Sequence, residues 1–185
     1  MTSESESSAC AAPILWITGL SGVGKSSLAR ALIARLHLQG LRPLLLDGDL
    51  LRDTLEAGGD PVSHAPQERE RRAWRIARLA CMAASQGVPV VVATISLIHV
   101  VQQWSRGTGL PYAEIWLRAG LTVLRDRQPA LYSQVAPMHV VGLDLPAQYP
   151  EHAELVIDQD FRHDHMQSQV DQALALWHRL ESTKQ

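Results

Sequence analysis

The sequence has few cysteines and no long apolar run. Its 185 residues include two cysteines, which are too few for a disulfide framework. Cys10 lies in a polar N-terminal stretch and Cys81 in an apolar helical stretch, which indicates a reducing, cytoplasmic environment. The longest apolar run, GVPVVVATISLIHVV, is interrupted by Pro89 and His99 and is shorter than the roughly 20 residues of a membrane span. We therefore expect no membrane segment.

A strong excess of charge is also missing. Seventeen Lys and Arg residues oppose 19 Asp and Glu residues, for a net charge of −2, which excludes a generally basic nucleic-acid binder. The start of the chain, MTSESESSAC, lacks the basic region of a secretory signal or a transit peptide. It is acidic and rich in serine, and we expect a disordered tail over residues 1–12. Residues 13–185 then form a single domain.

Short apolar runs alternate with helical patterns along the rest of the chain. Five nearly continuous runs are predicted strands, namely residues 13–20, 42–49, 88–96, 113–118 and 153–158. Helical spacing of apolar residues predicts helices over 26–38, 67–86 and 166–180. Strands separated by helices predict an α/β fold: a three-layer sandwich with a mostly parallel, five-stranded sheet and helices on both faces. Such folds bind ligands beyond the carboxyl ends of their strands.

The first predicted strand runs into GLSGVGKS, residues 19–26, which fits the phosphate-binding pattern G-x-x-x-x-G-K-[ST]. Gly22 and Gly24 allow backbone N–H groups to turn toward a phosphate, and the following helix adds the positive end of its dipole. We expect Lys25 to reach the β- and γ-phosphates of ATP and Ser26 to hold Mg²⁺. An ordinary glycine turn would need neither the lysine nor the second glycine. Further phosphate contacts are expected from Gly19, Ser21, Val23 and Ser27.

The second predicted strand ends in DGDLLRD, residues 47–53, where two carboxylates flank a glycine. Asp49 is placed to face the phosphates, where a carboxylate can accept the proton of a hydroxyl group or bind Mg²⁺. Arg52, three residues further on, is a candidate for binding an anionic acceptor. The structural alternative is a polar turn in which Asp49 caps a helix.

Arginines crowd one predicted helix. Arg69, Arg72 and Arg75 follow one another at a spacing that places them on roughly one side of the helix, where they are candidates for acceptor binding. The alternative is a solvated basic face that Glu68 and Glu70 balance.

In their order and spacing, several stretches resemble the adenylyl-sulfate (APS) kinase family. They are WITGLSGVGKSSLARAL, LLLDGDLLR, VVATIS, RQPALY and GLDLPAQYPEHAELVID, and they extend over about residues 14–158. The resemblance implies a P-loop kinase fold with a mobile lid, usually a homodimer, which transfers the γ-phosphoryl group of ATP to the 3′-hydroxyl of adenylyl sulfate. It implies that Asp49 is the catalytic carboxylate, that Arg127 begins the lid and contacts ATP, and that Ile95 and Ser96 contact the acceptor.

The sequence also departs from the family's usual pattern. The segment GDPVSHAPQERERR replaces a Leu-Gly-Phe-Ser stretch whose aromatic ring packs on the acceptor adenine, and His64 lies near that place. Arg72 stands where the family has an asparagine, and Leu97, Ile98 and His99 replace Pro-aromatic-Arg. The stretch QPALY lacks the lid lysine and one further residue.

The motifs for ATP are therefore kept, whereas several acceptor contacts are changed. One interpretation is a kinase of adenylyl sulfate. Another is a kinase of a different nucleotide conjugate, such as cytidine diphosphoramidate, in capsule or natural-product synthesis. A third is a non-catalytic ATP-binding module, which Asp49 and Arg52 argue against because a pure binder needs no carboxylate on the acceptor side. Trp74 and Trp104 are candidates to replace the missing aromatic ring.

The phosphate loop leads to a first prediction. Replacement of Lys25 by alanine is expected to lower the rate of phosphoryl transfer by at least about a hundredfold, because a well-placed charge contact in a transition state is worth about 3 kcal/mol. The fold should remain intact, as judged by an unchanged circular dichroism spectrum. Turnover near the wild-type rate in an ADP-release assay would contradict the assignment of this loop.

Overall fold

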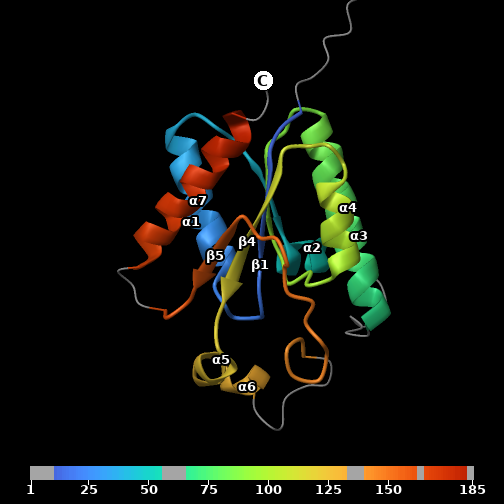
Figure 1. Cartoon of the computed structure of the whole chain (residues 1–185), viewed down its shortest axis with the longest axis vertical. Coiled ribbons are helices and arrows are strands. Elements are labelled where there is room, and N and C mark those ends of the chain that lie inside the picture. The colour runs from blue at the N-terminus through green and yellow to red at the C-terminus, as the bar shows by residue number, and fades with distance from the viewer. Residues whose placement is uncertain (1–10, 56–65, 133–139, 162–164, 183–185) are drawn as a thin grey trace, which may run out of the picture.

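The computed structural model describes residues 11–55, 66–132, 140–161 and 165–182 (Figure 1). Within these residues, five parallel strands form one sheet in the order β2-β3-β1-β4-β5. The strands are β1 (Ile14–Thr18), β2 (Leu44–Asp47), β3 (Val90–Ala93), β4 (Tyr112–Arg118) and β5 (Leu155–Asp158). The helices are α1 (Lys25–Leu38), α2 (Gly48–Leu55), α3 (Pro66–Ser85), α4 (His99–Arg106), α5 (Leu121–Arg127), α6 (Pro129–Tyr132) and α7 (His165–Ser182).

Helices cover both faces of the sheet, with α1 and α7 on one face and α3 and α4 on the other (Figure 1). The core follows the alternation of side chains along a strand. In β1, Leu15 and Ile17 pack toward α1 and α7, whereas Ile14 and Trp16 pack toward α3 and α4. The predicted three-layer α/β fold with a five-stranded parallel sheet is confirmed. Of the described helices, none has the length and apolar character needed to span a bilayer.

The predicted elements differ from the observed ones mainly at their ends. The three long helices were predicted to within two residues, and β4 begins one residue before its predicted run. The other four strands are shorter than their apolar runs because those runs continue into loops. The second run illustrates this, since β2 ends at Asp47 and α2 begins at Gly48. The helices α2, α4, α5 and α6 have four to eight residues each, too few for a clear helical period.

Ordered structure begins before the first strand. Ala12 was included in the predicted disordered tail, but it is 1% exposed and its N–H donates to the carbonyl oxygen of Ala84 at 2.8 Å. The tail expectation is therefore wrong at this residue, because its backbone is bound at the end of α3. Residues 1–10 lie outside the described residues, so the tail there and the single-domain organisation stay predictions.

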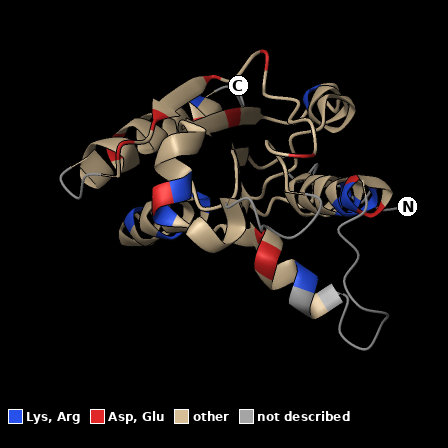
Figure 2. Cartoon of the chain, turned by 90° about the horizontal axis from the view of Figure 1, so that it is seen from below, with Lys and Arg blue, Asp and Glu red and all other residues tan. Residues whose placement is uncertain are grey.

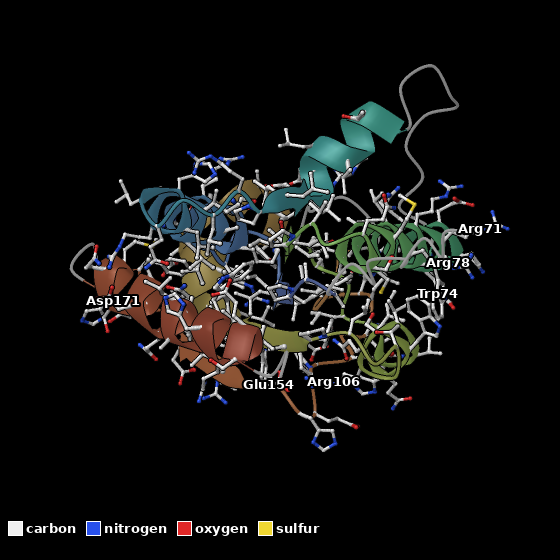
Figure 3. The ribbon with its side chains drawn as sticks, turned by 90° about the horizontal axis from the view of Figure 1, so that it is seen from above. Arg71, Trp74, Arg78, Arg106, Glu154 and Asp171 are labelled. Carbon is white, nitrogen blue, oxygen red and sulfur yellow. The ribbon has the colours of Figure 1, made fainter. Side chains whose placement is uncertain are left out.

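A network of ion pairs joins elements at the amino ends of β4 and β5. Arg106, at the end of α4, donates to Glu114 at 3.0 Å and to Glu154, which lies beside it in Figure 3. The hydroxyl of Tyr112 donates to Glu114 at 2.6 Å. Because Glu114 is only 1% exposed, these partners replace the water that its carboxylate group lacks. The network fastens α4 to the sheet at the end opposite the strands' carboxyl ends.

The carboxyl ends of the parallel strands all point to the end of the molecule where α5 and α6 lie (Figure 1). Figure 2 shows this end face on, with Lys and Arg residues on several of the helices around it. Loops that follow different strands meet here, which makes this end the place to look for a ligand site.

Candidate active site

A cavity of about 490 Å³ lies at this end of the sheet. Its walls come from the loop after β1, from α2 and α3, from the residues after β3, and from α5 and the segment that follows α6. Most of the predicted site residues line it: Ser21, Gly22, Gly24, Lys25, Ser26, Ser27, Asp49, Arg52, Arg69, Arg72, Ile95, Ser96 and Arg127. The fold therefore brings the predicted ATP side and the predicted acceptor side into one space.

The phosphate loop joins β1 to α1 and depends on glycine geometry. Gly22 has a φ of +75° and Gly24 a φ of +101°, values that side chains rarely allow. A Cβ atom on Gly22 would also lie 2.7 Å from the Cδ atom of Gln128. Helix α1 begins at Lys25, so the unpaired N–H groups of its first turn lie at the cavity wall. This arrangement suits a bound phosphate.

Two residues predicted as phosphate contacts do not line the cavity. Val23 is fully buried in the core beneath the loop. Gly19 has a φ of +147°, and a Cβ atom there would lie 2.4 Å from the carbonyl oxygen of Leu117. Both residues determine how closely the loop approaches the end of the sheet.

The Lys25 side chain lies between backbone and carboxylates. Its Nζ atom donates to the carbonyl oxygen of Leu20 at 2.8 Å. Desolvation of the ammonium group lowers the pKa of Lys25 to about 8, against the opposing effect of the Asp49 and Asp47 carboxylates. The loop thus holds a cation that is only partly charged near pH 8 and that a bound polyphosphate would stabilise.

Asp47 stabilises the junction where β2 passes directly into α2. This residue is 2% exposed, and its Oδ1 atom accepts a hydrogen bond from the Asp49 N–H at 3.0 Å. Gly48 is required by close packing, since a Cβ atom there would lie 2.8 Å from Oγ1 of Thr94. Asp49 lies in the first turn of α2 and forms an ion pair with Arg52. Asp47 therefore caps α2 through its side chain, and the alternative in which Asp49 is the cap is wrong. Asp49 is the second residue of the helix and lines the cavity.

Mg²⁺ prefers oxygen ligands, and the site offers oxygen atoms from three side chains. The Ser26 hydroxyl and the Asp49 carboxylate belong to residues that line the same cavity. In the part of the chain that the structure describes, the buried Oδ2 atom of Asp47 has no hydrogen-bond partner, and its nearest cation is Arg30 at 3.7 Å. This orphaned oxygen and the two cavity residues fit a hydrated magnesium ion.

Of the three arginines of α3 that were predicted as acceptor contacts, two line the cavity and one does not. Arg69 and Arg72 are wall residues, whereas Arg75 is exposed and outside the cavity. Desolvation and the neighbouring charge of Arg72 lower the pKa of Arg69. An anion that binds between two neighbouring guanidinium groups relieves the repulsion between their charges. The helix therefore contributes positive charge to the cavity from two of the three predicted positions.

The end of β3 supplies a polar wall. The Ser96 hydroxyl is 7% exposed and lies 3.2 Å from the Thr94 hydroxyl. The Thr18 hydroxyl donates to the carbonyl oxygen of Ile95 at 2.6 Å, which fixes the chain where it leaves the sheet.

Other cavity residues were not predicted. They are Gly48, Ala73, Ala93, Thr94, Ile98, Gln128, Leu131, Val140 and Val141. Most carry no charge and stand in loops or short helices, so no pattern in the chain marks them. Phe161 is another residue that the sequence did not single out. The Cζ atom of Arg127 lies 4.3 Å from the centroid of its ring.

The two tryptophans considered as a stacking platform lie outside the cavity wall. Their rings contact each other edge to face, with centroids 5.3 Å apart. Arg78 lies over the Trp74 ring, and Figure 3 shows both residues on α3. A role for Trp74 or Trp104 on the acceptor is therefore not supported. His64 lies outside the described residues, as do residues 133–139, which follow the stretch Arg127–Tyr132 where the lid is expected to begin.

A parallel sheet with a phosphate loop after β1 and a carboxylate at the start of α2, both on one cavity, defines the class of P-loop kinases. Within that class the chain belongs to the adenylylsulphate kinase family, whose model matches residues 11–158. The family resemblance predicted from the sequence is confirmed. The chain is an ATP-dependent phosphotransferase, and the alternative of a non-catalytic ATP-binding module is not favoured.

The relatives carry two kinds of name. An adenylyl-sulfate kinase of Paraburkholderia xenovorans is 35% identical over 158 residues, which cover 83% of this chain and 87% of the relative. A cytidine diphosphoramidate kinase of Campylobacter jejuni is 33% identical over 158 residues, covering 82% and 88%. A Mycobacterium tuberculosis APS kinase solved with AMPPNP and APS superposes with a TM-score of 0.79 at 27% identity, covering 91% of this chain and 98% of that one.

The lowered pKa of Lys25 leads to a prediction on ATP binding. A free amine with a pKa of about 8 is protonated in roughly one molecule in ten at pH 9, and polyphosphate favours the protonated form. We expect ATP binding at pH 9 to take up close to one proton from solution, and ATP affinity to fall about fivefold from pH 8 to pH 9. Titration calorimetry in two buffers of different ionisation enthalpy measures this uptake. Equal heats in both buffers at pH 9 would contradict it.

Asp49 is tested by replacement with asparagine. Asp47 caps α2, so the start of the helix should persist in this variant while the charge and basicity at position 49 are lost. We expect kcat to fall by at least about a hundredfold, with the Kd for ATP changed by less than about threefold. The matched control is Asp171→Asn, which removes an ion-paired carboxylate on α7, remote from the cavity. Retained activity in Asp49→Asn would contradict the catalytic role of this carboxylate.

Proposed function

We propose that this kinase transfers the γ-phosphoryl group of ATP to the 3′-hydroxyl of adenylyl sulfate. The observation that carries the proposal is the composition of one cavity, in which Asp49 and Arg52 share the space with the phosphate loop. Family membership supports this acceptor, because the relatives at 35% identity are named adenylyl-sulfate kinases. Phosphoryl transfer needs mainly positioning and charge stabilisation, and this cavity offers both.

On the ATP side, the loop glycines and the start of α1 bind the phosphates. Lys25 stabilises the charge that develops on the transferred group, and Arg127 contacts the nucleotide beside Phe161. Ser26 and Asp49 would hold Mg²⁺, with Asp47 behind them as an acceptor for its bound water. The ion would neutralise phosphate charge during transfer.

On the acceptor side, Asp49 accepts the proton of the attacking hydroxyl group. Arg52, Arg69 and Arg72 bind the anionic part of the acceptor, since guanidinium groups suit sulfate and phosphate oxygens. Ile95 and Ser96 form the wall beneath it. Arg75 has no part in this proposal because it lies outside the cavity.

A homodimer in the cytoplasm, where ATP is made, completes the proposal. One structural neighbour is described as a hexameric APS kinase of Thiobacillus denitrificans, with a TM-score of 0.65 at 26% identity, over 92% of this chain and 29% of that one. Self-association therefore occurs among similar proteins. Light scattering on the purified chain at assay concentration distinguishes a dimer from a monomer or a hexamer.

The acceptor is tested by a ratio of kcat/KM values at fixed ATP and Mg²⁺. We expect adenylyl sulfate to exceed cytidine diphosphoramidate by at least about tenfold, because the arginine-lined cavity must distinguish the two anions and a contact to a charged group is worth about 1.5–3 kcal/mol. We also expect a KM for adenylyl sulfate above that of relatives with the aromatic ring, since a base stack is worth about 1–3 kcal/mol. A preference for the cytidine conjugate would overturn the proposed acceptor.

A further inference from the structure

The short helix α6 lies directly against the phosphate loop. Tyr132, its last residue, is 1% exposed, and its hydroxyl donates to the carbonyl oxygen of Ser21 at 2.8 Å. The Gln128 side chain, just before α6, packs against Gly22 so closely that a Cβ atom there would lie 2.7 Å from its Cδ atom. Two successive residues of the loop are therefore held by residues more than one hundred positions further along the chain.

The hydrogen bond from Tyr132 to Ser21 determines the direction of a backbone N–H group that can donate to a phosphate. The carbonyl group of Ser21 and the N–H group of Gly22 belong to one peptide unit, which is planar and trans. In such a unit the C=O and N–H bonds point in opposite directions. Because Tyr132 binds the oxygen, the Gly22 N–H is directed away from Tyr132, and both residues of this peptide unit line the cavity.

We propose that Tyr132 is a positioning residue, whose hydroxyl orients the Ser21–Gly22 peptide so that the Gly22 N–H can bind a phosphate of ATP. Without this hydrogen bond the peptide can rotate more readily, since one of the two flanking angles, φ of Gly22, is little restricted. Tyr132 acts only through the loop, and it is not among the residues that line the cavity.

The chemistry of the side chain suits a permanent tether. Burial raises the pKa of Tyr132 to about 12. The phenol therefore remains a donor throughout the pH range of an enzyme assay. The proposal rests on the use of ATP and is independent of which acceptor the enzyme phosphorylates.

The test compares two tyrosine-to-phenylalanine variants of the full chain. Tyr132→Phe keeps the buried ring and removes the hydrogen bond to the loop. Tyr112→Phe is the matched control, because its hydroxyl donates to Glu114 at 2.6 Å at the other end of the sheet. Titration calorimetry measures the Kd for ATP, for inorganic tripolyphosphate and for AMP, and melting curves confirm that each variant is folded.

We expect Tyr132→Phe to raise the Kd values for ATP and for tripolyphosphate by about fivefold each, which is the effect of one neutral hydrogen bond. The Kd for AMP should change by less than about twofold. Tyr112→Phe should leave all three Kd values unchanged. The proposal is overturned if ATP and tripolyphosphate keep their affinity while only the melting temperature falls. It is equally overturned if AMP weakens as much as ATP, or if the control shows the same loss.

If Tyr132→Phe does not fold, a second variant tests the proposal. Gln128→Ala removes the other contact of this segment with the loop and leaves the buried tyrosine in place. A loss of tripolyphosphate affinity of about twofold, with AMP binding unchanged, supports the inference that this segment positions the loop. Unchanged tripolyphosphate binding in this variant would contradict it. Wild-type ATP binding provides the reference, so failure of the proposed acceptor cannot be mistaken for failure of this proposal.

Discussion

The site depends on how closely the backbone approaches itself where the parallel strands end. Gly19 lies against the carbonyl oxygen of Leu117, Gly22 against Gln128, and Gly48 against the Thr94 hydroxyl. At each of these places a side chain would push the loops apart. This packing brings the N–H groups of the phosphate loop and the carboxylate of Asp49 onto one cavity, and the proposed chemistry needs both.

Two groups of cations line the cavity that we propose binds both substrates. Lys25 is desolvated at the proposed ATP side, where its pKa is lowered to about 8 although carboxylates lie nearby. At the proposed acceptor side, desolvation and the charge of Arg72 lower the pKa of Arg69 as well. Both ends of the cavity therefore hold cations in an environment that disfavours their charge. Anionic ligands relieve this cost, which is how such a site gains affinity for two polyanions at once.

Much of the ATP side of the cavity could be predicted, because the residues that mark it are close together in the sequence. The phosphate-loop pattern is specified by four positions within residues 19–26, namely Gly19, Gly24, Lys25 and Ser26, and a strand and a helix on either side define their geometry. Arg75 shows the limit of such reasoning, because spacing alone placed it with Arg69 and Arg72 although it lies outside the cavity. The tryptophan platform failed similarly, since Trp74 and Trp104 pack on each other rather than on the cavity.

The sequence by itself determined the fold class, the ATP-binding motif and the carboxylate after the second strand, because apolar runs and short glycine motifs act over a few residues. Tertiary structure alone decided what meets at the cavity. Tyr132 reaches Ser21 across more than one hundred residues. Thr94 meets Gly48, and Gln128 meets Gly22, only because β3 and α5 end beside these glycines. Such contacts leave no periodic trace in the chain, since they join neutral residues whose neighbours are set by the order of strands in the sheet.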